Sequence, residues 1–194
     1  MSAPKILVFS SSTRTGSHNT KLAALAAKEL TLNDVDVTRI SLADYPLPLY
    51  DADLDARTGQ PANALKLKQM ITAHHGVFIA SAEYSASVTP ILKNAIDWVS
   101  RVREKGDPTY AAFKDRVFAI GAVTTGPSGG QRSLMALRQI LELGCGAWVL
   151  PQQVSIPNAA QAFDEMDNII DTGINNYFRA ELDKLVDMAR LMMM

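Results

Sequence analysis

The chain has 194 residues, of which 47% are hydrophobic and 20% charged, with a formal net charge of −1. This length suits one domain over residues 1–194. The charge gives no reason to expect nucleic acid or an anionic membrane as partner, and no apolar stretch approaches the ~20 residues that cross a bilayer. Cys145 is the lone cysteine, and no signal peptide is recognisable. We therefore expect a cytoplasmic protein.

Strands and helices alternate along the predicted chain. Apolar runs that lack polar alternation are typical of strands buried on both faces of a parallel sheet. One further segment carries Asp36, Thr38 and Arg39, and its polarity predicts an edge strand. In chain order, the predicted strands cover residues 5–9, 35–42, 76–80, 117–123 and 147–150.

Helical patterns lie between these strands. The clearest is the apolar stripe at residues 91–99, where Thr89 is a good N-cap and Pro90 takes the first helical position. The longest irregular stretch covers residues 43–61, and such loops are often functional. The predicted helices cover residues 20–30, 63–73, 91–99, 131–143 and 163–191, the last with a break near Gly173.

Alternating strands and helices predict an α/β fold of three layers, a doubly wound five-stranded parallel sheet with right-handed crossovers. In such sheets ligands bind beyond the carboxyl ends of the strands, where the winding reverses. The loops after the first, third and fourth strands are therefore the candidate site.

The loop after the first strand, residues 10–19, carries hydroxyls on six of its ten residues. It opens a helix, and a helix N-terminus with Ser and Thr hydroxyls and Arg14 suits a phosphate. A hydroxyl-rich turn that merely caps a helix is the alternative. Gly16 is its one glycine, and no Gly-Lys-Ser/Thr ending follows, so a dinucleotide or Walker-type site is disfavoured. A mononucleotide phosphate fits better.

The loops after the third and fourth strands suit a flat ring. The first of them places Tyr84 among small polar residues, and the second, residues 124–130, is rich in small residues that let a ring approach the backbone. Backbone N–H groups there can stabilise negative charge. Taken alone, each loop is also consistent with a simpler interpretation, an ordinary loop aromatic or a flexible turn.

Together these residues resemble the NADPH-dependent FMN reductase family, which includes chromate, quinone and azo-dye reductases. The family pattern Gly-Ser-x-Arg-x-x-Ser-x-Asn stands at residues 11–19, with Ser11 in place of glycine. The pattern Pro-Glu-Tyr-Asn-x-Ser stands at residues 82–87, with Ala82 for proline and Ser85 for asparagine. Leu-Lys-Asn-Ala-Ile-Asp-Trp follows intact at residues 92–98.

The resemblance implies a flavodoxin-like sheet with strand order 2-1-3-4-5 and bound FMN. It also implies homodimers or homotetramers with flavin sites near subunit interfaces. His18 lies in the first loop and is a further candidate contact. The implied cofactor residues are Ser12, Arg14, Ser17 and Asn19 at the phosphate, Ala82, Glu83, Tyr84 and Ser85 beside the ring, and Thr124, Thr125 and Gly126 on its pyrimidine side.

The expected activity is hydride transfer from NADPH or NADH to FMN, and then reduction of a small acceptor: a quinone, azo compound, metal oxyanion or free flavin. The cofactor carries this chemistry, so no catalytic side chain is expected. No metal role is expected for His74 and His75, which lack a carboxylate or cysteine cluster. A flavodoxin-type electron carrier and a flavin-binding sensor remain as alternatives, and no 2′-phosphate pocket is recognisable that would select NADPH.

Overall fold

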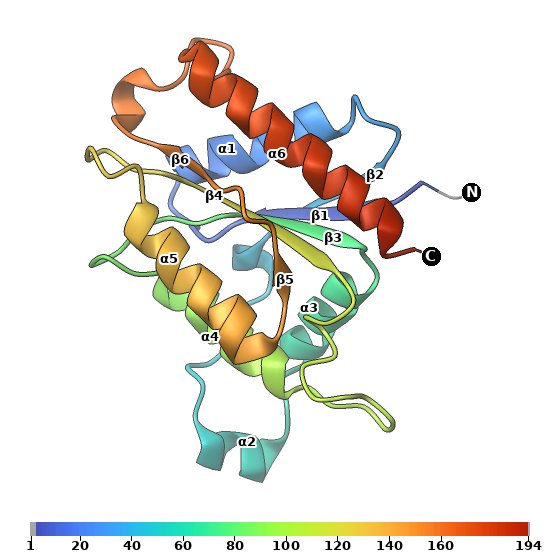
Figure 1. Cartoon of the computed structure of the whole chain (residues 1–194). Coiled ribbons are helices and arrows are strands. Elements are labelled where there is room, and N and C mark those ends of the chain that lie inside the picture. Colours follow the sequence, from blue (N-terminus) through green and yellow to red (C-terminus); the bar gives the residue numbers. More distant parts are fainter. Residues whose placement is uncertain (1–2, 194) are drawn as a thin grey trace.

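The computed structural model describes residues 3–193 and is built around one parallel sheet (Figure 1). Its strand order is β2-β1-β3-β4-β5, with β6 also paired to β4, so the implied order 2-1-3-4-5 is confirmed. Every pairing is parallel. The strands are β1 (Lys5–Ser10), β2 (Asp36–Ser41), β3 (Gly76–Ala80), β4 (Val117–Val123), β5 (Trp148–Val149) and β6 (Val154–Ile156).

Helices cover both faces of the sheet, which gives the three layers that the sequence predicts (Figure 1). One face packs against α1 (His18–Leu30) and α6 (Thr172–Leu191). The other packs against α3 (Ala62–Thr72), α4 (Pro90–Arg101) and α5 (Gln131–Gln139). Within residues 3–193, no helix is long and apolar enough to cross a membrane.

The burial of the strands follows their sequence pattern. All residues of β3 and β4 are buried, whereas β2 at the sheet edge is only partly buried, as its polarity predicts. Thr89 caps α4, where its hydroxyl accepts from the Leu92 amide, and Pro90 opens the helix. Apolar burial on both faces of the sheet is the main stabilising contribution.

The last edge strand is divided into two short pieces, where the sequence predicts one strand. β5 pairs with the start of β4 and β6 with its end. Pro151 lies in the break, and a proline cannot donate to a strand ladder. The chain therefore leaves the sheet after Leu150 and rejoins it at Val154.

The prediction of helix from residue 163 onward is wrong, because α6 begins only at Thr172. The Asp164 carboxylate accepts hydrogen bonds from the amides of Met166 and Asn168, a local turn that competes with helix. Asp171 then caps α6 by accepting from the Ile174 amide at 2.8 Å. The glycine expected to break this helix, Gly173, lies in its first turn.

The stretch predicted as irregular, residues 43–61, contains regular structure. A 3-10 turn (Leu42–Asp44) follows β2, and the short helix α2 (Ala52–Thr58) is capped by Asp51. Between them, the Pro48 carbonyl accepts a 2.8 Å hydrogen bond from the indole N–H of Trp98 on α4. Elsewhere in the chain, α5 does not end at Gln139 but continues through a π-helical turn (Ile140–Gly144).

Candidate functional site

A cavity of about 180 Å³ lies at the carboxyl ends of β1, β3 and β4. The three loops that the sequence singles out therefore meet at one place. Most of the expected cofactor residues line this cavity, and Ser85 and Gly126 do not. The lining residues are Ser12, Arg14, Ser17, His18, Asn19, Ala82, Glu83, Tyr84, Val123, Thr124 and Thr125.

The first turn of α1 is available to an anion. Ser17 is the N-cap residue, yet its side chain makes no capping hydrogen bond, and no acidic residue lies in this turn. Arg14 donates to the Thr15 carbonyl at 3.3 Å and forms no ion pair with any residue in the range 3–193. Uncapped amides and an uncompensated guanidinium together make this end of the cavity positive.

His18 brings a buried polar atom without a partner to the same cavity. No residue between 3 and 193 hydrogen-bonds its Nδ1. Burial, followed by the positive charges of Arg14 and Lys21, holds the pKa of His18 below its usual value. A buried ring nitrogen without a partner is costly, and an anionic ligand that contacts it would remove that cost.

Asn19 joins α1 to β4 beneath the cavity. Its side-chain amide donates to the Val123 carbonyl at 2.8 Å and accepts from the Val123 amide at 2.9 Å. Asn19 is 4% exposed, so this pair is shielded from water. The interaction fixes the first loop relative to the fourth strand, and Val123 is a lining residue that the sequence did not single out.

Ser11, which stands where the family has glycine, faces the protein interior. It is fully buried, and its hydroxyl accepts from the Ala82 amide at 2.7 Å. Its carbonyl accepts from the Thr89 hydroxyl at 2.8 Å. The residue thus connects the first loop to the third-strand loop and does not line the cavity.

Glu83 connects the third-strand loop to α5. Its carboxylate accepts from the Ser133 amide at 3.1 Å and lies 3.7 Å from the Arg132 guanidinium. An acidic group near the first turn of a helix is favourable. Sequence spacing gives no signal for Ser133, because the partner that caps this amide lies 50 residues away.

The third-strand loop ends in a tight two-residue turn. Tyr84 and Ser87 exchange backbone hydrogen bonds of 3.0 Å, and Ser85 and Ala86 between them have φ of 48° and 59°. Such turns favour asparagine, the family residue at position 85. Ser85 therefore sits at the turn while Tyr84, 51% exposed, borders the cavity.

The fourth-strand loop is held by its own backbone and by β6. Thr124 donates its amide to the Ile156 carbonyl at 3.1 Å and its hydroxyl to the Gly126 carbonyl at 3.3 Å. Gly130 has φ of 85°, and a Cβ there would meet the Ala122 Cβ at 2.5 Å. This packing explains why a glycine precedes α5.

Comparisons with known proteins show which family the chain resembles. The model of the NADPH-dependent FMN reductase family matches residues 4–161. An NAD(P)H-dependent FMN reductase of Pseudomonas aeruginosa is 31% identical over 182 residues, 93% of this chain and 92% of that protein. A quinone reductase of Escherichia coli K12 is 35% identical over 138 residues, 71% of this chain and 69% of that protein.

The fold has close relatives among solved structures. The flavoenzyme NAD(P)H:(acceptor) oxidoreductase FerB from Paracoccus denitrificans matches with a TM-score of 0.78 and 25% identity, covering 97% of this chain and 98% of that one. The expected fold, cofactor and enzyme class are confirmed. The chain therefore belongs to the NADPH-dependent FMN reductase family and is an FMN-dependent NAD(P)H oxidoreductase with a flavodoxin-like fold.

Proposed function

We propose that the cavity between the three loops holds FMN by its phosphate and that the enzyme passes electrons from NAD(P)H to a quinone. One observation carries the proposal. The uncapped N-terminus of α1, Arg14 and the loops after β3 and β4 converge on one cavity, lined by most of the residues that the family pattern implies.

The phosphate end is the first turn of α1. The amides of this turn, the hydroxyls of Ser12 and Ser17 and the Arg14 guanidinium would donate to the phosphate. His18 Nδ1, which lacks a hydrogen-bond partner among residues 3–193, would gain one from the phosphate. Each hydrogen bond to a charged group contributes about 1.5–3 kcal/mol, so several of them hold the phosphate firmly.

Buried Ser11 and Asn19 and partly buried Glu83 position the loops of the cavity, and their polar groups are not used on the ligand. Asn19 fixes α1 to Val123, and Ser11 fixes the first loop to Ala82. Glu83 caps α5 from the third-strand loop. We assign Asn19 and Glu83 a positioning role, because their polar groups already contact the backbone of neighbouring elements.

The cavity is too small to enclose the whole of FMN. A volume of about 180 Å³ is below the roughly 300–1,000 Å³ of sites that enclose a whole drug-sized ligand. This cavity would hold the phosphate and ribityl chain, and Ala82, Glu83, exposed Tyr84 and Ser85 of the third-strand loop would hold the ring. The backbone N–H groups of Thr125 and Gly126 would be available to its pyrimidine side, whereas the Thr124 amide already donates to the Ile156 carbonyl. FMN, when bound, supplies the chemistry, accepting a hydride from NAD(P)H and passing two electrons to the acceptor.

The acceptor class is supported by the curated quinone reductase relative, which covers 71% of this chain. Because Tyr84 is 51% exposed, a ring held beside it would be accessible to a second flat molecule, and a quinone is flat. Two electrons and two protons convert a quinone to a hydroquinone, a balance that one NAD(P)H and one solvent proton satisfy.

We also propose that copies of this chain associate as a homodimer or homotetramer in the cytoplasm. Large apolar side chains are exposed on α5, on the π-helical turn after it and on β5. Leu143 is 83% exposed, Met135 on α5 68% and Trp148 on β5 62%. Such a surface favours contact with another protein.

An anaerobic reduction experiment tests the function. FMN-loaded protein is mixed with NADPH or NADH, and the absorbance of oxidised flavin is followed; a benzoquinone is then added. We expect bleaching by at least one nucleotide and recovery on addition of the quinone. A flavin that neither nucleotide bleaches would contradict the proposal and favour the sensor interpretation.

A further inference from the structure

His18 is the first residue of α1, and the family pattern does not specify it. That pattern reads Ser-x-Asn at positions 17 to 19, and this chain has histidine at the open position. The side chain lines the flavin cavity, as Arg14 and Ser17 do. Histidine is the side chain whose ordinary titration falls between pH 5 and 8, so a charged ligand can change its protonation state.

The His18 ring has no hydrogen-bond partner in the protein. Its Nδ1 is shielded from water and unpaired, and no hydrogen bond joins either ring nitrogen to a residue between 3 and 193. The other two histidines differ, because His74 Nδ1 contacts the Met70 carbonyl and His75 Nδ1 accepts from the Lys5 amide at 2.9 Å. Buried polar groups usually have a partner, so the unpaired ring indicates that a ligand supplies one.

The surroundings of His18 in α1 and the first loop disfavour a proton on the free ring. Burial, followed by the positive charges of Arg14 and Lys21, holds the pKa of His18 below its usual value. The Lys21 ammonium is paired with Asp167 in the turn before α6, whereas Arg14 has no ion-pair partner within the range 3–193. The free amides at the start of the helix add further positive potential.

The β3 and β4 sides of the cavity provide little compensation. Glu83 faces the cavity from the third-strand loop, but its carboxylate already accepts from the Ser133 amide and lies 3.7 Å from the Arg132 guanidinium. A phenol such as Tyr84 is uncharged near neutral pH. The fourth-strand loop contributes residues 123–125, none of which titrates. An anion that favours a charged ring must therefore come with the ligand.

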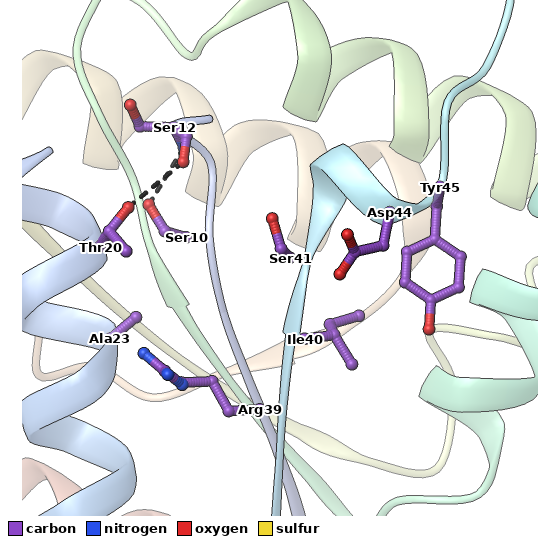
Figure 2. Close-up of a pocket in the computed structure, with 9 residues that line it drawn as sticks. All are labelled: Ser10, Ser12, Thr20, Ala23, Arg39, Ile40, Ser41, Asp44 and Tyr45. Carbon is purple, nitrogen blue, oxygen red and sulfur yellow. Dashed lines mark hydrogen bonds between the residues drawn. The ribbon is translucent and has the colours of Figure 1, made fainter. Parts of the chain in front are cut away.

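The β2 side of the first loop holds a separate cavity of about 470 Å³ (Figure 2). Its charged residues, Arg39 and Asp44, line that cavity and not the flavin cavity. Thr20 donates to the Ser12 carbonyl at 3.4 Å, which holds the first loop against α1 (Figure 2). No compensating charge for His18 is therefore supplied from this side.

We propose that His18 takes up a proton when FMN binds and, as an imidazolium, pairs with the FMN phosphate. The proposal rests on the proposed function, because it assumes that the phosphate lies at the first turn of α1. A phosphate monoester carries close to two negative charges at pH 7, and this charge counteracts the burial that disfavours a proton. Riboflavin brings no anion and should bind without this proton uptake.

The direction of the pH dependence follows from linkage. The phosphate raises the pKa of His18 in the complex above that of the free protein. The contribution of His18 to FMN binding is therefore complete below the free-protein pKa and is lost as the pH rises through the pKa of the complex. Below about pH 6 the phosphate takes up a proton of its own, which weakens binding in any variant. Comparison of two proteins at the same pH removes this second effect.

Calorimetry on protein stripped of flavin counts the protons that binding takes up, from titrations in buffers with different heats of ionisation. We expect FMN to cause uptake near pH 6.5 in the wild type and less in His18→Gln. The ratio of wild-type to His18→Gln affinity for FMN should be about 5- to 10-fold larger at pH 6.5 than at pH 8. His75→Gln, which removes a histidine just before β3 at the opposite edge of the sheet, is the matched control.

Proton NMR of the imidazole rings is a second measurement that needs no change at His18. The chain has three histidines, so His74→Gln and His75→Gln assign the His18 signal by elimination. We expect its titration midpoint to move to higher pH when FMN is bound. Equal proton uptake in the wild type and His18→Gln, or an unmoved midpoint, would overturn the proposal. Equal affinity for FMN and riboflavin would instead overturn the phosphate site of the proposed function.

Discussion

Ser11 and Ala82 are two departures from the family pattern, and they contact each other. The Ser11 hydroxyl accepts from the Ala82 amide at 2.7 Å, and both residues are buried. The family has glycine at position 11, which has no side-chain hydroxyl, and proline at position 82, which has no backbone N–H group. The serine is therefore the partner that the alanine N–H requires, and the two departures compensate each other.

A double-mutant cycle tests this compensation. Ser11→Gly leaves the buried Ala82 amide unpaired, which should cost about 1–3 kcal/mol of unfolding free energy. Ala82→Pro places a ring carbon where the N–H now meets the Ser11 hydroxyl, so it should also destabilise the fold. The double variant has neither an unpaired N–H at position 82 nor a hydroxyl at position 11 for the proline ring to meet. Its loss, measured by urea unfolding, should be smaller than the sum of the single losses by about 1 kcal/mol or more. Strict additivity would show that the two positions are independent.

At the scale of elements, a side chain of α6 supplies a hydrogen-bond acceptor at the break in the sheet edge. β4 pairs with β5 at Val117 and Phe118 and with β6 from Gly121 onward, so Ile120 faces the break. The Glu181 carboxylate of α6 accepts from the Ile120 amide at 3.2 Å, and burial raises the pKa of Glu181 to about 8. Glu181 is fully buried, so its ionised form is the costly one.

This carboxyl makes stability depend on pH. The folded pKa of about 8 lies above the unfolded value of 4.5. The contribution of Glu181 is therefore complete below the unfolded pKa and is lost as the pH rises through the folded pKa. Unfolding free energies measured from pH 5 to 9 should fall more steeply in the wild type than in Glu181→Gln. At pH 8 to 9 the variant should be the more stable protein by at least about 1 kcal/mol. Parallel pH profiles would contradict this assignment.

At the scale of the whole molecule, the parts of the fold that depend on local pattern could be predicted. Unbroken apolar runs fix β1, β3 and β4, and the polar residues of β2 mark it as an edge. The first loop and the Tyr84 loop could be placed at one site, because the carboxyl ends of parallel strands meet at the same edge.

The parts that could not be predicted depend on distant contacts or, at the start of α6, on a local turn. The break between β5 and β6 is compensated by Glu181, 61 residues from its partner Ile120, and no spacing rule links them. Asn19 resembles a ligand contact in the sequence, yet its amide pairs with Val123, 104 residues away. The start of α6 depends on the turn around Asp164, which competes locally with a continuous helical pattern.

The most direct test of the central proposal compares FMN with riboflavin, which lacks the phosphate. Protein stripped of flavin is titrated with each, and quenching of flavin fluorescence gives the affinity. We predict that FMN binds roughly 100-fold or more tightly, because several charge-assisted hydrogen bonds are lost with the phosphate. Arg14→Ala should weaken FMN binding by about 10-fold and leave riboflavin binding unchanged. Equal affinity for the two flavins, or an equal effect of Arg14→Ala on both, would contradict a phosphate site at the N-terminus of α1.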